Sequence, residues 1–177
     1  MSRKRKLQKL LLTALFTALT AAGALLHIDV ASLQTMFACL AGLLLGPVWG
    51  PVSQALYVFL GLLGLPIFVG GGGFAYVLKP FFGFLPGLIL CAFVTGVLSK
   101  KTQWNIWLIT TLGLLSVYLI GTPYFYFIWR AQTEEMNAWI AIAASCLVYL
   151  PLDFAKLIAV SVIGKRLMPV VRYDLYE

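Results

Sequence analysis

The stretch Tyr149-Leu-Pro-Leu-Asp153-Phe-Ala-Lys156-Leu-Ile-Ala-Val places a carboxylate and an ammonium three residues apart in an otherwise apolar segment. Residues at that spacing lie on one face of an α-helix. Counted back from the basic pair Lys165-Arg166, Asp153 lies about 18 Å into a hydrocarbon core of about 30 Å. Each ionisable group at that depth costs at least about 2.5 kcal/mol, so it marks a ligand or ion path or is neutralised by a partner. The pair therefore predicts either a functional site or a polar contact that joins helices.

The composition is that of an integral membrane protein. Of the 177 residues, 62% are apolar and 11% are charged, and the mean hydropathy is +0.96. At about 25 to 30 residues per span and connection, this length holds six transmembrane helices in a single domain over residues 1–177. The net charge of +7 does not predict a nucleic-acid partner, because the basic residues gather at membrane boundaries.

Six apolar segments predict an all-α integral membrane protein. Gly46-Pro47 separates the second from the third, Gly121-Thr122-Pro123 is expected to interrupt the fifth, and Pro151 is expected to kink the sixth. The segments are approximately Leu7–Leu26, Leu33–Leu45, Val48–Leu65, Phe84–Leu98, Ile106–Trp129 and Asn137–Leu167.

The basic residues orient these helices. With six spans, one side holds ten lysines and arginines, at positions 3, 4, 5, 6, 9, 100, 101, 165, 166 and 172. The other side holds only Lys79 and Arg130, which is followed by two glutamates. Both termini are therefore predicted to be cytoplasmic. The basic N-terminus could also begin a cleaved signal, but the apolar segment from Leu10 to Leu26 is long and further spans follow.

A run of four glycines, Gly70 to Gly73, follows the third predicted helix and faces outward in this topology. Such a run does not form a helix, and non-helical backbone near membrane depth is tolerated only where protein or a cavity satisfies it. With no side chains in the way, its backbone donors can approach a ligand. We therefore expect a glycine-rich outward loop beside a binding site.

The residues offer no catalytic set. The sole histidine, His27, lies at a membrane boundary, and there is no HExxH, GxSxG or Walker A motif. Cys39, Cys91 and Cys146 are isolated within predicted spans and are interpreted as small core residues. We predict no enzyme activity, no cofactor and no metal.

A binding site fits the residues better. Lys156 can meet a ligand carboxylate, Asp153 can accept hydrogen bonds, and aromatic residues, Phe81 among them, can cover an apolar body. The alternative from another class is a stand-alone proton-coupled carrier for a small organic carboxylate. The predicted substrate-binding residues are Asp153, Lys156, Lys79, Gln34, Gly71, Gly72, Gly73, Phe74, Tyr76 and Phe82.

Several motifs occur in a fixed order along the chain. They are Leu33-Gln34-Thr35, Ala41-Gly42-Leu-Leu-Leu-Gly46-Pro47, Leu60-Gly61-Leu-Leu-Gly64-Leu-Pro66, Lys79-Pro80-Phe-Phe-Gly83-Phe84 and Leu150-Pro151-Leu-Asp153-Phe-Ala-Lys156. In this order and spacing the chain resembles, over nearly its whole length, the S components of energy-coupling factor (ECF) vitamin transporters, specifically the BioY biotin-transporter family.

The resemblance implies a six-helix, substrate-binding subunit of an ATP-driven importer in the bacterial plasma membrane, with its site near the outer face. It also implies partners, namely a transmembrane T component and two ATPase subunits. Ala14, Ala18 and Ala22 form a stripe of small residues at four-residue spacing on the first helix. This stripe is the implied docking surface for the T component.

The chain departs from the family pattern at several polar positions. Pro151-Leu152-Asp153 stands where Pro-Gly-Asp is common, and Leu114 stands where Asn is frequent. Lys79-Pro80-Phe81-Phe82-Gly83-Phe84 stands where Gly-Pro-Thr/Ser-x-Gly-Tyr is common, so Phe81 replaces a hydroxyl residue and Phe84 replaces a tyrosine. A pocket that loses polar partners discriminates less in favour of a ligand that needs them. The predicted ligand is therefore biotin or a biotin-like carboxylate such as lipoate.

Overall fold

The computed structural model describes residues 3–26, 32–102, 104–132, 137, 140, 143 and 149–176. Apart from one isolated bridge between Phe68 and Gly71, this part of the chain contains no β-structure. In chain order the helices are α1 (Arg3–Leu25), α2 (Gln34–Leu62), the 3₁₀ helices η1 (Phe74–Leu78) and η2 (Pro80–Gly83), α3 (Phe84–Lys101), α4 (Ile106–Gln132) and α6 (Leu150–Tyr176). The predicted all-α class is confirmed.

Polar and apolar side chains are distributed as expected for a protein in lipid. Leu119 and Phe127 on α4 are exposed, whereas Gln54 and Thr95 are fully buried between helices. Within the described ranges, four segments are long and apolar enough to cross a membrane: α1, α2, Pro80–Lys101 and α4. The chain is therefore a multi-pass membrane protein, and the full count of six spans stays a prediction.

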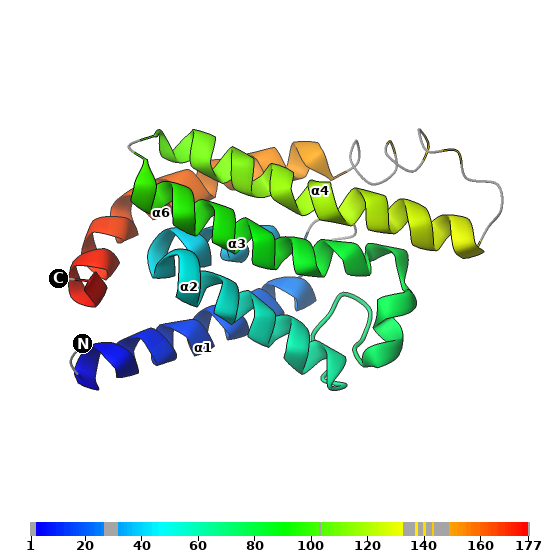
Figure 1. Ribbon diagram of the computed structural model, residues 1–177, viewed down its shortest axis with the longest axis horizontal. Coiled ribbons are helices and arrows are strands. Elements are labelled where there is room, and N and C mark those ends of the chain that lie inside the picture. The colour runs from blue at the N-terminus through cyan, green and yellow to red at the C-terminus, as the bar shows by residue number, and fades with distance from the viewer. Residues whose placement is uncertain are drawn as a thin grey trace.

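The helices pack in sequence order. Figure 1 shows α1, α2, α3 and α4 following one another from the bottom of the view to the top, each packed on the next. The two termini lie at the same end of the molecule. α6 packs on both α2 and α4. Because α2 contacts α1, α3 and α6, it forms the centre of the bundle.

Gly46 breaks α2 at the predicted position. Its backbone angles (φ 77°, ψ −170°) lie outside the helical region, in a conformation that glycine adopts without a Cβ penalty. A Cβ on Gly50 would lie 2.9 Å from the carbonyl oxygen of Ala41, an approach that a straight helix does not allow between residues nine apart. The two halves of α2 therefore turn back on each other, as the predicted second and third segments require.

The expected interruption of the fifth segment is wrong. α4 runs without a break through Pro123. Proline removes one backbone hydrogen bond, but packing holds the helix on either side of it. A Cβ on Gly121 would overlap the ring of Phe84, and Phe125 is buried, so the backbone of α4 lies close against the start of α3. This contact outweighs the local effect of the proline.

The glycine run is non-helical, as predicted. Gly70, Gly71 and Gly73 all have positive φ, and the chain from 63 to 73 folds back on the end of α2. The Gly73 N–H donates to the Gly61 carbonyl at 2.7 Å. The glycines thus let the connection return to the helix from which it leaves.

The last helix differs from expectation at its end. α6 continues to Tyr176, past the predicted limit at Leu167, and Lys165-Arg166 lies within the helix. Pro151 lies in the first turn of α6, where a proline breaks no intrahelical hydrogen bond. Most of the predicted start of this segment, at 133–148, lies outside the described residues, as does the connection at 27–31 that holds His27.

Candidate functional site

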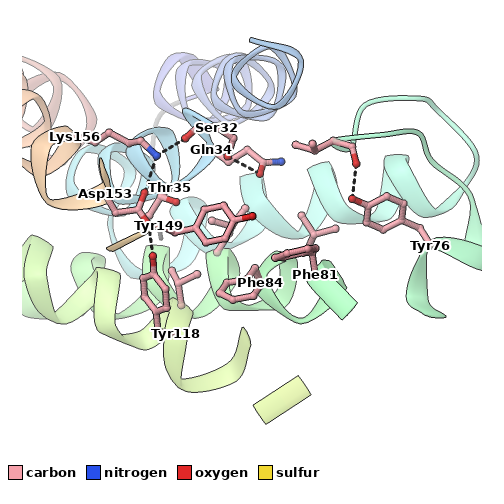
Figure 2. A pocket seen from close by; sticks show the side chains of 14 residues that line it. Ser32, Gln34, Thr35, Tyr76, Phe81, Phe84, Tyr118, Tyr149, Asp153 and Lys156 are labelled. Carbon is pink, nitrogen blue, oxygen red and sulfur yellow. Dashed lines mark hydrogen bonds and ion pairs between the residues drawn. The ribbon is translucent and has the colours of Figure 1, made fainter. Parts of the chain in front are cut away.

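A cavity of about 230 Å³ lies between α2, α3, α4 and α6. Figure 2 shows its polar side chains at one end and aromatic rings along its length. The polar lining residues are Ser32, Gln34, Thr35, Asp153 and Lys156, and the aromatic ones are Tyr76, Phe81, Phe84, Tyr118 and Tyr149. Such a lining suits an amphipathic small molecule.

Asp153 and Lys156 form an ion pair within this lining. Lys156 Nζ lies 2.7 Å from Asp153 Oδ1, and the two side chains are 14% and 10% exposed. The Tyr118 hydroxyl donates to Asp153 Oδ2 at 2.6 Å, and Lys156 also donates to the Ser32 carbonyl at 2.7 Å. The pair therefore joins α6 to α4 and to the residues just before α2, and it also faces the cavity. A polar contact between helices and a place in a binding site are thus compatible roles for the pair.

A chain of hydrogen bonds leads from this pair to the glycine-rich loop. The Ser32 hydroxyl donates to Gln34 Oε1 at 3.1 Å, and Gln34 Nε2 donates to the Tyr57 hydroxyl. Tyr57 in turn donates to the Ile67 carbonyl at 3.1 Å. Gln34 thus orients polar groups at the cavity and supports the first residues of the loop.

Aromatic rings form the apolar wall. The Phe81 ring lies 5.8 Å from Tyr149 and 6.1 Å from Phe84, and Phe84 meets Tyr118 edge-on at 5.8 Å. These distances are typical of favourable aromatic pairs. The wall joins η2, α3, α4 and the beginning of α6, so the cavity shape depends on all four elements.

The loop closes over one end of the cavity through its own side chains. The Tyr76 hydroxyl donates to the Val69 carbonyl at 2.7 Å, and burial raises the pKa of this phenol. Lys79 Nζ donates to the Gly70 carbonyl at 3.0 Å and lies 4.6 Å from the centre of the Tyr76 ring. The lysine therefore links Gly70 to Tyr76.

The structure brings four of the predicted substrate-binding residues to the cavity: Gln34, Tyr76, Asp153 and Lys156. The others lie outside its lining, and their contact with a ligand stays a prediction. Phe74 is 78% exposed, and the Phe82 ring packs on Tyr124. The remaining ones are Lys79, Gly71, Gly72 and Gly73 in the loop and its flank.

Sequence reasoning missed Ser32, Thr35, Tyr118, Tyr149 and Phe84 as lining residues. A buried carboxylate needs hydrogen-bond donors, and tyrosines on neighbouring helices are the natural ones. This rule predicts that a donor such as Tyr118 bonds Asp153, but it does not identify which tyrosine faces the carboxylate. Of the positions that depart from the family pattern, Phe81 and Phe84 line the cavity, whereas Leu114 and Leu152 do not.

The sulfur and carboxylate groups do not assemble into a metal centre in the described ranges, where no three His, Cys, Asp or Glu residues cluster. Cys39 and Cys91 are buried, as expected for core residues, and their Sγ atoms lie 3.3 Å apart. Cys146 lies outside the described residues.

Comparisons with known proteins agree with this architecture. Residues 1–173 match the model of the BioY family. A probable biotin transporter of Lysinibacillus sphaericus is 34% identical, covering 97% of this chain and 92% of the relative. Another from Pyrococcus horikoshii is 34% identical, covering 92% and 97%.

A solved structure is also similar. The crystal structure of the S component for biotin from an ECF-type ABC transporter superposes with a TM-score of 0.73 at 30% identity, covering 94% of each chain. These relatives are named as transporters, which confirms the prediction of a transport protein of the plasma membrane, not an enzyme. The chain belongs to the BioY family.

Proposed function

We propose that this protein is the substrate-binding S component of an ECF-type importer and that it captures biotin. The observation that carries the proposal is the Asp153–Lys156 pair at one end of a cavity walled by aromatic rings. A polar end and an apolar wall match a ligand with one hydrogen-bonding ring and an aliphatic chain. Family membership and the similarity to an S component for biotin support the same assignment.

The charges of the pair favour biotin over lipoate. Because Asp153 compensates Lys156, this end of the cavity offers an acceptor and a donor side by side rather than a net positive charge. The ureido ring of biotin carries N–H donors and a carbonyl acceptor that can meet both groups. The dithiolane of lipoate has neither, so it would add no hydrogen bond to either group.

The departures from the family pattern weaken this preference little. Leu152 is 40% exposed, and Leu114 is buried away from the cavity. Phe81 and Phe84 are the departures that line the cavity, and both contribute an apolar ring. The relatives are named as biotin transporters, so neither lipoate nor a stand-alone carrier finds support among them.

Calorimetry on the purified protein tests the ligand. We expect biotin to bind at least about 100-fold more tightly than lipoate, because a site built to bond polar groups rejects an analogue that lacks them. Octanoate, which shares only the carboxylate and the chain, serves as the control and should bind as weakly as lipoate. Equal affinity for biotin and lipoate would contradict the proposal.

The proposed topology has six spans, both termini in the cytoplasm and the glycine-rich loop outside. The position of both termini at one end of the molecule supports it (Figure 1). The proposed partners are a T component and two ATPase subunits, with Ala14, Ala18 and Ala22 as the docking stripe. These alanines are exposed on α1, whereas Thr17 and Thr20 are buried and bond to Ser53 and Gln54 of α2.

Replacing Ala18 with tryptophan should block assembly and leave biotin binding unchanged. The large ring would hold a partner helix away from the stripe, and Ala18 lies on the face of α1 away from the cavity. Co-purification of the T component measures assembly, which we expect to fall about tenfold. Leu119→Trp, at an exposed position of α4, is the matched control. If Ala18→Trp assembled normally, the stripe would not be the docking surface.

A further inference from the structure

Most polar groups that line the cavity are already bonded within the protein. Lys156, Asp153, Ser32, Gln34, Tyr118 and Tyr76 all make hydrogen bonds to other residues. In the part of the chain that the structure describes, only the hydroxyls of Thr35 and Tyr149 line the cavity without such a bond. A ligand that meets the Asp153–Lys156 pair can therefore find two further hydroxyls in the lining that have no partner among the described residues.

The two hydroxyls occupy different places. Figure 2 shows Thr35 beside the Asp153–Lys156 pair, whereas the ring of Tyr149 extends away from the pair and its hydroxyl points into the cavity. The Asp153 N–H donates to the Tyr149 carbonyl at 3.0 Å, which sets the tyrosine one helical turn before the pair. The Phe81 ring, 5.8 Å away, supports the phenol from the side. The Tyr149 hydroxyl is thus held at a defined separation from the charged pair.

The charges of the lining residues indicate which part of a ligand meets the Tyr149 hydroxyl. If the neutral ring of biotin occupies the compensated pair, its carboxylate must lie elsewhere along the cavity. Lys156 is the only cation in the described lining, and Lys79 is held outside by the Gly70 carbonyl. An anionic group therefore depends on neutral donors, and a phenol donates a short, charge-assisted hydrogen bond to a carboxylate.

We propose that the Tyr149 hydroxyl donates a hydrogen bond to the carboxylate of the bound ligand and so selects for its anionic form. This inference rests on the proposed function. It makes Tyr149 a binding residue in addition to the charged pair, and it fixes the direction of the ligand, with the ring at Asp153 and Lys156 and the carboxylate toward Tyr149.

The test compares Tyr149→Phe with the wild-type protein on two ligands. For biotin we expect the variant to lose about 10-fold in affinity, since it removes one hydrogen bond to a charged group and keeps the ring. For biotin methyl ester, which has no carboxylate, we expect a change of less than about 3-fold. Tyr76→Phe is the matched control, because its hydroxyl bonds the Val69 carbonyl and should affect both ligands equally.

The outcomes separate this inference from the proposed function. Biotin affinity that is unchanged in Tyr149→Phe, or an equal loss for biotin and its ester, would overturn the role of the hydroxyl while the protein remains a biotin binder. A wild-type protein that fails to bind biotin would overturn the proposed function and the inference together.

Discussion

Replacing Lys156 with methionine is expected to weaken biotin binding by about 10- to 100-fold, because a hydrogen bond from a charged donor contributes about 1.5 to 3 kcal/mol. The variant keeps most of the side-chain volume but removes the ammonium that bonds Asp153 and the Ser32 carbonyl. Asp153 would then lack its counter-charge, and the ligand would lack its donor. Calorimetry with biotin on the purified variant measures the loss.

Lys79→Met is the matched control for this experiment. Lys79 lies near the cavity but donates to the Gly70 carbonyl and is absent from the lining. We expect this variant to change biotin affinity less than about 3-fold, since a surface hydrogen bond contributes little. A larger loss for Lys79→Met than for Lys156→Met would place the ligand under the loop instead of at the charged pair.

Replacing Gly42 with alanine is expected to destabilise the fold by about 3 kcal/mol, because the new methyl group has no space. A Cβ at Gly42 would overlap the carbonyl oxygen of Ala92 and Oγ1 of Thr95, both on α3. Backbone does not move aside as a flexible side chain does, so α2 and α3 would have to separate. The midpoint of thermal unfolding in detergent should fall by about 10 °C.

Gly164→Ala, the same substitution at another helical glycine, is the control. A Cβ there would lie 3.1 Å from Leu43 Cδ1, the end of a flexible side chain that needs to shift by only a few tenths of an ångström. We expect its midpoint to change by less than about 3 °C. If both variants unfolded at the same temperature, close backbone contact at Gly42 would not be what holds α2 against α3.

Local patterns in the sequence were enough to predict much of the fold. The apolar segments, the turn at Gly46 and the non-helical glycine run depend on hydrophobicity and backbone freedom within a few residues. The interruption at Pro123 was a local prediction that failed, since packing of Gly121 on Phe84 keeps α4 continuous. Local rules hold until a tertiary contact opposes them.

For the site, too, some features follow from local sequence and others from tertiary contacts. By itself the sequence determined that Asp153 and Lys156 share one helical face of an apolar segment, because helical periodicity follows from the residues alone. Only the tertiary structure decided that Tyr118 meets Asp153, that the Ser32 carbonyl meets Lys156 and that Tyr149 faces the cavity. The physical reason is that contacts between helices depend on how each helix is rotated and shifted against its neighbours, and packing over the whole bundle sets those positions.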